Sequence, residues 1–189
     1  MSLLIFLSFS KIAIITYLVV TVLYATRDLK KICWICTISK IGVALLVTYL
    51  FLQAKGDAET INKRIYLTQS AFRIIWHNPM VGTGIGNYLY AQSNIPNPYP
   101  YHFLEPVHNI LLLTLAEIGI PIVIALLYLL SAYIRLIWKT PIGQAVIITV
   151  VLTGMFDHYW LTLQQNILLL PVLFALLKNE GKYDKIERT

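Results

Sequence analysis

Residues 64–90 read RIYLTQSAFRIIWHNPMVGTGIGNYLY, and residues 105–120 read EPVHNILLLTLAEIGI. The two stretches bring together arginines, closely spaced glycines and a histidine at an expected helix start, and hydrophobic segments flank them on both sides. They form a polar interval in an otherwise apolar chain. The rest of the sequence is typical of a membrane scaffold that holds this interval.

The composition indicates an integral membrane protein. Of the 189 residues, 58% are hydrophobic and 13% are charged, and the mean hydropathy is +0.69. This is too apolar for a soluble domain with a polar exterior. The net charge of +6 is not accompanied by an arginine-rich run or by a basic amphipathic helix with interleaved aromatic residues, so we expect no nucleic-acid partner.

Five stretches approach the roughly 20 apolar residues that a helix needs to cross a bilayer. The sequence therefore predicts an all-α, polytopic membrane protein with about five transmembrane helices and one large outward-facing loop that contains short helices. The predicted membrane segments are 3–25, 32–53, 108–134, 141–156 and 161–177.

The basic residues predict the orientation. Ten of the 15 lysines and arginines lie in the short connections 26–40 and 135–140 and from Lys178 to the C-terminus, and these parts should therefore be cytoplasmic. We expect four regions: two N-terminal membrane helices with a basic cytoplasmic connection, an outward-facing loop, three C-terminal membrane helices and a cytoplasmic tail. Their predicted bounds are 1–53, 54–107, 108–178 and 179–189.

The loop contains an amphipathic pattern over residues 57–73 that predicts a helix, which should end before Pro79. The glycines at 82, 84 and 86 are spaced G-x-G-x-G, without a preceding hydrophobic strand or a Walker lysine, which excludes a nucleotide-binding loop. Two interpretations remain. The glycines form a tight bend that needs positive φ angles, or the backbone N–H groups at Gly84 and Gly86 face an anion.

Arg64 is a candidate catalytic residue, and Arg73 is a candidate substrate-binding residue. They are nine positions apart, so one straight helix places them on opposite faces, and they converge only if the helix ends or bends between them. Each is either a solvated loop charge or an anion-binding group, because a guanidinium group matches the geometry of a phosphate. Anion binding is favoured more at Arg64 than at Arg73.

His108 is the candidate base. Glu105 and Pro106 are ordinary helix-start signals, and the positive end of a helix dipole disfavours an imidazolium ion. A neutral histidine at the outer membrane boundary can accept a proton. The polar neighbour Asn109 is a candidate substrate-binding residue.

Two charged residues fall within predicted membrane segments, where burial of a charge is costly. Lys11 either extends its long side chain to the outer interface or binds an anion or Glu117. Glu117, nine residues beyond His108 and about 13 Å along a continuous helix, is either a functional acid or a buried partner for a cation.

Two further groups point less clearly to chemistry. Cys33 and Cys36 form a single C-x-x-C without a second pair or a nearby histidine, so we expect no metal site there. Asp157 and His158, next to Tyr159 and Trp160, form an outer cap in which interface anchoring is the favoured interpretation.

Taken in order, these motifs resemble one family. Arg64, then W-x-N-P-x-x-G-x-G-x-G-N from Trp76, then HN at 108–109 and LAEIGI at 115–120 are similar to the C-terminal half of the membrane domain in the O-antigen ligase and O-antigen polymerase family. LSFSKIA at 7–13 is similar to a serine-arginine helix segment of that family, with lysine where arginine is usual. GMFDHYWLTLQQ at 154–165 also resembles its members.

The resemblance implies a membrane glycosyltransferase of the cytoplasmic (inner) membrane. It would take a glycan from an undecaprenyl diphosphate carrier on the outer face and pass it to a glycan, lipid or protein acceptor. It implies that His108 is the base, that Arg64 and Lys11 bind the diphosphate, and that Asn109 orients the histidine or a sugar. The chemistry then requires no metal and no other cofactor, and the product is inverted at the anomeric carbon.

Family members have several further helices before this region, so the resemblance also implies a missing N-terminal half as a partner. Two alternatives are kept. One is a non-enzymatic membrane subunit of a polysaccharide export or assembly system, and the other is an inactive C-terminal fragment of a ligase.

Overall fold

The computed structural model describes residues 11–27, 42, 49, 58–97 and 104–186. Within these residues every regular element is a helix, which confirms the all-α prediction. The elements are α2 (Lys11–Arg27), α4 (Ala58–His77), α5 (Tyr88–Ser93), α6 (Ile110–Ile118), α7 (Ile120–Ile137), α8 (Pro141–Phe156), α9 (Tyr159–Thr162) and α10 (Gln164–Ile186).

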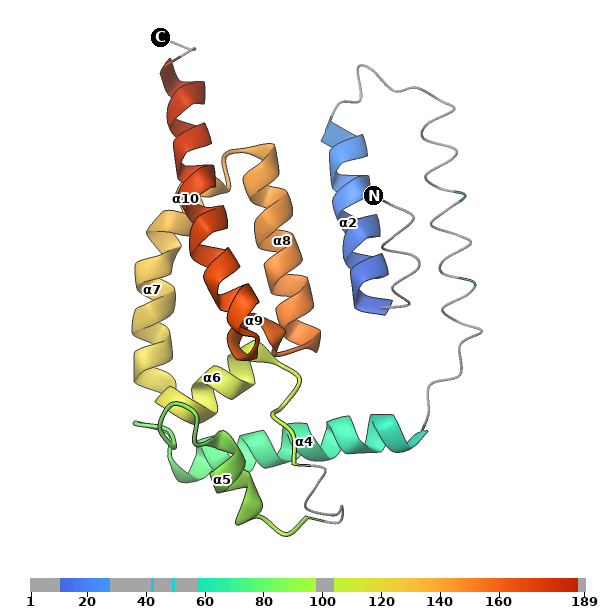
Figure 1. Ribbon diagram of the computed structural model, residues 1–189, viewed down its shortest axis with the longest axis vertical. Helices are drawn as coiled ribbons and strands as arrows, with labels where there is room; N and C mark the ends of the chain where they lie inside the picture. Colours follow the sequence, from blue (N-terminus) through green and yellow to red (C-terminus); the bar gives the residue numbers. More distant parts are fainter. Residues whose placement is uncertain (1–10, 28–41, 43–48, 50–57, 98–103, 187–189) are drawn as a thin grey trace.

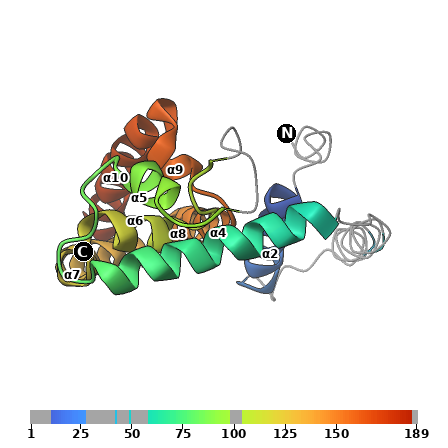
Figure 2. The ribbon, with the colours of Figure 1, turned by 90° about the horizontal axis from the view of Figure 1, so that it is seen from below.

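The helices form two layers (Figure 1). Helices α2, α7, α8 and α10 run along the long axis of the molecule, and α4 crosses beneath them with α5 and α6 beside it. Helix α2 packs on α8, and α10 contacts both α7 and α9. Figure 2 shows α4 from below, passing across the lower ends of this group. The described residues of the predicted outward-facing loop, 58–97 and 104–107, therefore lie at one end of the long helices.

The long helices carry the apolar surface. Helix α7 is long and apolar enough to cross a membrane, with a mean hydropathy of 2.2 over its 18 residues, and only 11% of them are buried. Tyr128 and Leu129 on α7 are 77% and 71% exposed, which suits contact with lipid. Residues 12–22 and α8 are shorter apolar helices. The second predicted membrane segment, 32–53, lies almost wholly outside the described residues.

Helix α4 has the amphipathic character expected from its sequence. Leu67, Ser70, Ala71 and Ile74 form a buried stripe at helical spacing, and their neighbours on the other faces are exposed. The predicted helix over 57–73 is confirmed, although it continues to His77. It stops before the Asn78–Pro79 pair, as expected from the restriction that proline places on the preceding residue.

The core below the long helices joins α4, α5 and α6. It contains Ala71, Ile74, Tyr88, Val107, Leu113 and Ala116, all of them buried. Val107 immediately precedes His108, so the core fixes the backbone from which the candidate base projects.

The prediction of one continuous helix over 108–134 is wrong. Gly119 takes φ +80° and separates α6 from α7, and Pro121 stands in the first turn of α7. Positive φ ends a right-handed helix, and proline has no N–H with which to continue the backbone ladder. Glu117 therefore lies on the short helix α6, which runs beside α4 (Figure 1), and not on the long apolar helix α7.

Candidate active site

The candidate site forms where the segment before α6 meets the turn between α8 and α9. Residues 104–107 are not helical, and Asn109 is the N-cap of α6: its Oδ1 accepts the Leu112 N–H at 3.0 Å. Its Nδ2 donates to the carbonyl of Met155 at 3.1 Å. Asn109 thus fastens the start of α6 to the end of α8, and Pro106 lies before the helix instead of in its first turn.

His108 lies between two carboxylates. Its Nδ1 is 3.7 Å from Oδ1 of Asp157, and its Nε2 is 3.7 Å from Oε2 of Glu105. Both distances are too long for a hydrogen bond, so the contacts are electrostatic. Nδ1 is buried and has no hydrogen-bond partner among the described residues. A shift of less than 1 Å would let it donate to Asp157, and catalytic contacts are often this loose before substrate binds.

Glu105 is held ionised by Lys63. The Lys63 Nζ donates to Oε1 of Glu105 at 2.9 Å, and this hydrogen bond lowers the pKa of the carboxyl group below its usual range. Desolvation opposes the shift, and the charges of Lys63 and His108 add to it. The carboxylate that faces Nε2 of His108 is therefore negative at neutral pH.

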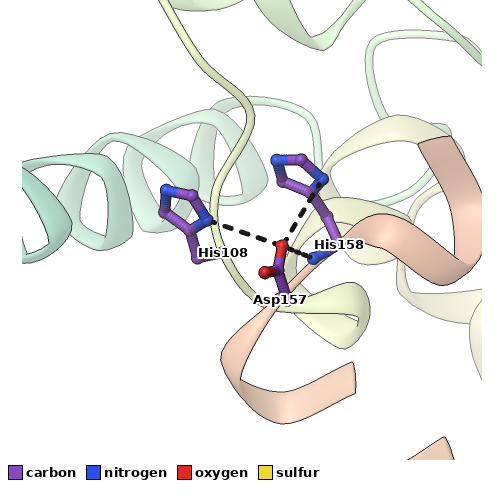
Figure 3. A group of neighbouring side chains, drawn as sticks. All are labelled: His108, Asp157 and His158. Atoms are coloured by element: carbon purple, nitrogen blue, oxygen red, sulfur yellow. Dashed lines mark hydrogen bonds and ion pairs between the residues drawn. The ribbon is translucent and has the colours of Figure 1, made fainter. Parts of the chain in front are cut away.

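His158 packs against His108. The two imidazole rings are stacked with centroids 5.3 Å apart and planes 11° apart (Figure 3). The backbone N–H of His158 donates to Oδ1 of Asp157 at 2.8 Å, and its Nδ1 lies 3.0 Å from Oγ1 of Thr162. Burial lowers the pKa of His158, and the neighbouring His108 lowers it further, against the opposing charges of Asp157 and Glu105. A second positive charge beside His108 is thereby disfavoured.

Asp157, His158, Glu105 and Lys63 were not selected as site residues from the sequence. Interface anchoring was preferred for the first two, but Figure 3 shows both side chains turned toward His108. The sequence signals for Asp157 and His158 were their position at a polar turn between apolar segments and the family resemblance of residues 154–165. Glu105 was interpreted only as a helix-start residue.

The predicted arginines lie elsewhere on α4. Lys63 continues the buried line of Leu67, Ser70 and Ile74, whereas Arg64 is one residue on, about 100° around the helix, and exposed. Arg73 is also exposed, and α4 continues unbroken through both arginines, so they do not converge. The structure thus brings neither arginine into the His108 cluster. Lys11 begins α2, but its side chain is outside the described part of the chain.

The predicted glycine bend is present and is fastened to the break between α6 and α7. The N–H groups of Thr83 and Gly84 donate to the carbonyls of Ala116 and Glu117 at 2.9 and 2.8 Å. Gly82, Gly84 and Gly86 all have positive φ, as the first interpretation required. The N–H of Gly84 is engaged with Glu117, which leaves that group unavailable to an anion. Glu117 therefore contributes its backbone to this bend.

His108, Asp157 and His158 are also the described residues best placed to hold a metal ion. Each offers one ligand atom, and these atoms all lie within 4.8 Å of one another. The measured separations of 3.7 and 3.9 Å from Asp157 to the two histidines exceed the roughly 3.3 Å between ligands of tetrahedral zinc. The cluster would have to contract around such an ion.

Comparison with known families identifies the family of this chain. The profile of the O-antigen ligase family matches residues 1–127, about two thirds of the chain. The chain belongs to the O-antigen ligase family. This confirms the resemblance drawn from the motifs, and it implies a ligase-like membrane glycosyltransferase with lipid-linked glycan substrates. No curated protein and no solved structure gives a significant match.

The O-antigen ligase match includes Lys11, Arg64 and His108 but ends within α7. Asp157 and His158 lie beyond it, so the geometry alone associates them with His108.

Proposed function

We propose that this O-antigen ligase family member transfers a glycan from an undecaprenyl diphosphate carrier to an acceptor hydroxyl on the outer face of the cytoplasmic membrane. In this proposal about five helices span the bilayer, and residues 54–107 face outward. The observation that carries it is the placement of His108, which lies between two carboxylates at the junction of the long helices with the lower layer formed by α4, α5 and α6.

The imidazole of His108 would carry its proton on Nδ1, directed at Asp157, which leaves the Nε2 lone pair as the base. Nε2 takes the proton of the acceptor hydroxyl while the hydroxyl oxygen attacks the anomeric carbon. The bond from that carbon to the diphosphate oxygen breaks on the opposite side, so the product is inverted. Asp157 and Glu105, both within 3.7 Å, stabilise the imidazolium ion that forms.

The departing diphosphate leaves with its negative charge and is stabilised by cations. Arg64 is exposed, and its guanidinium has no partner among the described residues, so it is available to a ligand. Lys11 would be a second cation, acting as a point charge without a bidentate fork. Charge neutralisation by these side chains would make a metal unnecessary in principle.

The test is reconstitution of the full chain in nanodiscs with a chemically defined undecaprenyl diphosphate glycan and glycan, lipid or protein acceptors. The expected result is a transferred glycan with inverted anomeric configuration, formed equally well in EDTA. A retained configuration would exclude direct attack. Absence of product with every acceptor would favour a non-enzymatic subunit or an inactive fragment, and loss of transfer in EDTA would assign the histidine cluster to a metal.

A further inference from the structure

A polar cavity that is widely open to solvent lies beside the glycine bend, away from the His108 cluster. Its volume is about 610 Å³, and an adjoining cavity of about 460 Å³ shares Asn78, Ala91 and Asn94 with it. Cavities of this size hold small-molecule ligands. The first is lined by Asn78, Gly82, Thr83, Asn87, Tyr90, Ala91 and Asn94, and the second also has Arg73, Ile74, His77, Ile95 and Pro96.

The side of the cavity formed by the glycine bend is closely packed against the α6–α7 break. A Cβ atom on Gly82 would lie 2.4 Å from the backbone of Glu117, and one on Gly119 would lie 2.5 Å from the carbonyl oxygen of Met80. The Ile120 N–H donates to the carbonyl of Pro79 at 2.8 Å, in addition to the bonds from Thr83 and Gly84. A preformed wall loses little entropy when a ligand binds.

The lining offers hydrogen-bonding groups that the described chain does not use. The side chains of Asn78 and Tyr90 have no partner among the described residues, and Tyr90 is 75% exposed. Asn87 and Asn94 each donate from Nδ2 to a backbone carbonyl, which leaves Oδ1 as an acceptor. Amides that both donate and accept, beside an aromatic face, suit a ligand rich in hydroxyl groups.

The charges of the lining residues restrict the classes of ligand that can bind in the cavity. No carboxylate occurs among the described lining residues, so a cation finds no counter-charge there. The formal positive charge comes from Arg73 in the second cavity. The ring nitrogen Nδ1 of His77 lies 2.8 Å from the Arg73 carbonyl, which can only accept, so Nδ1 carries the proton and Nε2 is an acceptor in the neutral ring. A neutral or anionic sugar meets these conditions.

The cavity and His108 are associated with opposite ends of α6. Asn109 next to His108 caps the first end, and the glycine bend is fastened at Ala116 and Glu117 near the other. Nine residues separate Asn109 from Ile118, about 13 Å at 1.5 Å per residue. A single sugar ring at His108 would not reach the cavity, whereas a longer glycan would.

We propose that this cavity is a remote saccharide-binding subsite, which holds a sugar several units away from the sugar that reacts at His108. The inference rests on the proposed transferase function and adds to it a preference for long glycans over short ones. The bound glycan belongs either to the lipid-linked donor or to the acceptor, because both present the same hydroxyl-rich chemistry.

Binding is measured on the full chain in nanodiscs of phosphatidylethanolamine and phosphatidylglycerol. One probe is the oligosaccharide released by mild acid from the host's lipid-linked glycan, and the other is the soluble acceptor glycan.

Asn78→Ala and Tyr90→Ala should each weaken binding of one probe roughly fivefold or more, and the affected probe identifies the source. The matched controls, Asn62→Ala on α4 and Tyr128→Ala on α7, should bind within twofold of wild type. Tyr128 is a suitable control because its exposed fraction, 77%, is close to the 75% of Tyr90. Unchanged binding of both probes in the cavity variants would overturn the subsite.

A transfer assay separates this subsite from the catalytic proposal. Tyr90→Ala should raise KM for substrates with several sugars and leave kcat, and KM for a one-sugar substrate, unchanged; equal effects on both substrates would contradict a remote subsite. His108→Gln should bind the released oligosaccharide as wild type does while losing transfer. If His108→Gln remained active, the base assignment would fail, and the subsite would still stand on the binding data.

Discussion

The two ends of α6 are held in different ways. At the C-terminal end, backbone hydrogen bonds of 2.8–2.9 Å fix the bend at 82–84 to the α6–α7 break. Gly82 and Gly119 lie there so close to the backbone of the opposite segment that neither position has room for a Cβ atom. At the N-terminal end, the backbone is capped by Asn109, but the side chains of His108 and Asp157 remain 3.7 Å apart. Backbone at the first end is locked, and side chains at the second have room to adjust. A fixed backbone suits a ligand-binding surface at the C-terminal end of α6. Side chains that move closer when substrate binds suit proton transfer at the N-terminal end.

The largest effect should come from removing the charge next to His108. In the structure the backbone N–H of His158 donates to Oδ1 of Asp157 at 2.8 Å, and Asp157→Asn keeps an oxygen that can accept this hydrogen bond. The substitution removes the carboxylate charge that orients His108 and stabilises its imidazolium ion. We expect single-turnover transfer to fall by about 100-fold or more, with KM for the donor unchanged. A rate within twofold of wild type would show that the approach of the two side chains has no catalytic role.

The rigid end is tested by Gly82→Ala. Its φ of +69° and the 2.4 Å approach to Glu117 should cost roughly 2–4 kcal/mol of stability, measured by thermal unfolding in detergent. Gly86→Ala is the matched control, because Gly86 has a φ of +77° but nothing within 4 Å of a new Cβ. It should cost only about 1 kcal/mol. Equal melting temperatures for the two variants would contradict the close fastening at Gly82.

The opposite faces of α4 should differ in donor recognition. Arg64→Lys removes a bidentate fork and should raise the donor Kd about tenfold if Arg64 binds the diphosphate. Arg73→Lys, half a turn away around the helix and nine residues along it, should leave the affinity for undecaprenyl diphosphate itself unchanged. The measurement is titration of each nanodisc-embedded variant with the glycan-free carrier. Equal affinities of wild type and Arg64→Lys for the carrier would show that Arg64 is only a solvated charge.

A smaller effect concerns pH. Burial lowers the pKa of His158 in the folded chain below its ordinary value of 6.5, so the unfolded chain binds more protons between the folded value and 6.5. Its contribution to stability is therefore complete above pH 6.5 and is lost as pH falls through that window. The melting temperature should decline there in the wild type and decline less in His158→Gln. If the melting temperatures of wild type and His158→Gln declined equally with falling pH, His158 would not be the cause of the decline.

Much of the fold could be predicted from local patterns. The buried stripe of α4, its stop before Pro79 and the glycine bend all follow from spacing and backbone chemistry that the sequence displays. The break at Gly119 was missed because a glycine inside a long apolar run also suits a loosened continuous helix. The backbone of Met80 and Val81, from a distant segment, lies so close to Gly119 that a Cβ atom would not fit there, and no local pattern in the sequence shows this approach.

The site was predicted only in part for the same reason. His108 stood out through its local setting before a helix, and Asn109 through its position beside it. The approach of Asp157 and His158 depends on how α6 and α8 pack, which no local spacing encodes. Lys63 and Arg64 are adjacent in sequence, and the difference between a core-facing and an exposed position on α4 selected Lys63 as the partner of Glu105.

The most direct test of the account is single-turnover glycan transfer by His108→Gln with the donor already bound, beside the control Asn62→Ala on α4. We predict that His108→Gln binds the lipid-linked donor normally and loses transfer by at least about 100-fold, because the acceptor hydroxyl has no base. Asn62→Ala, at an exposed position of α4 outside both the His108 cluster and the cavity, should transfer at the wild-type rate. Wild-type transfer by His108→Gln would contradict the central claim.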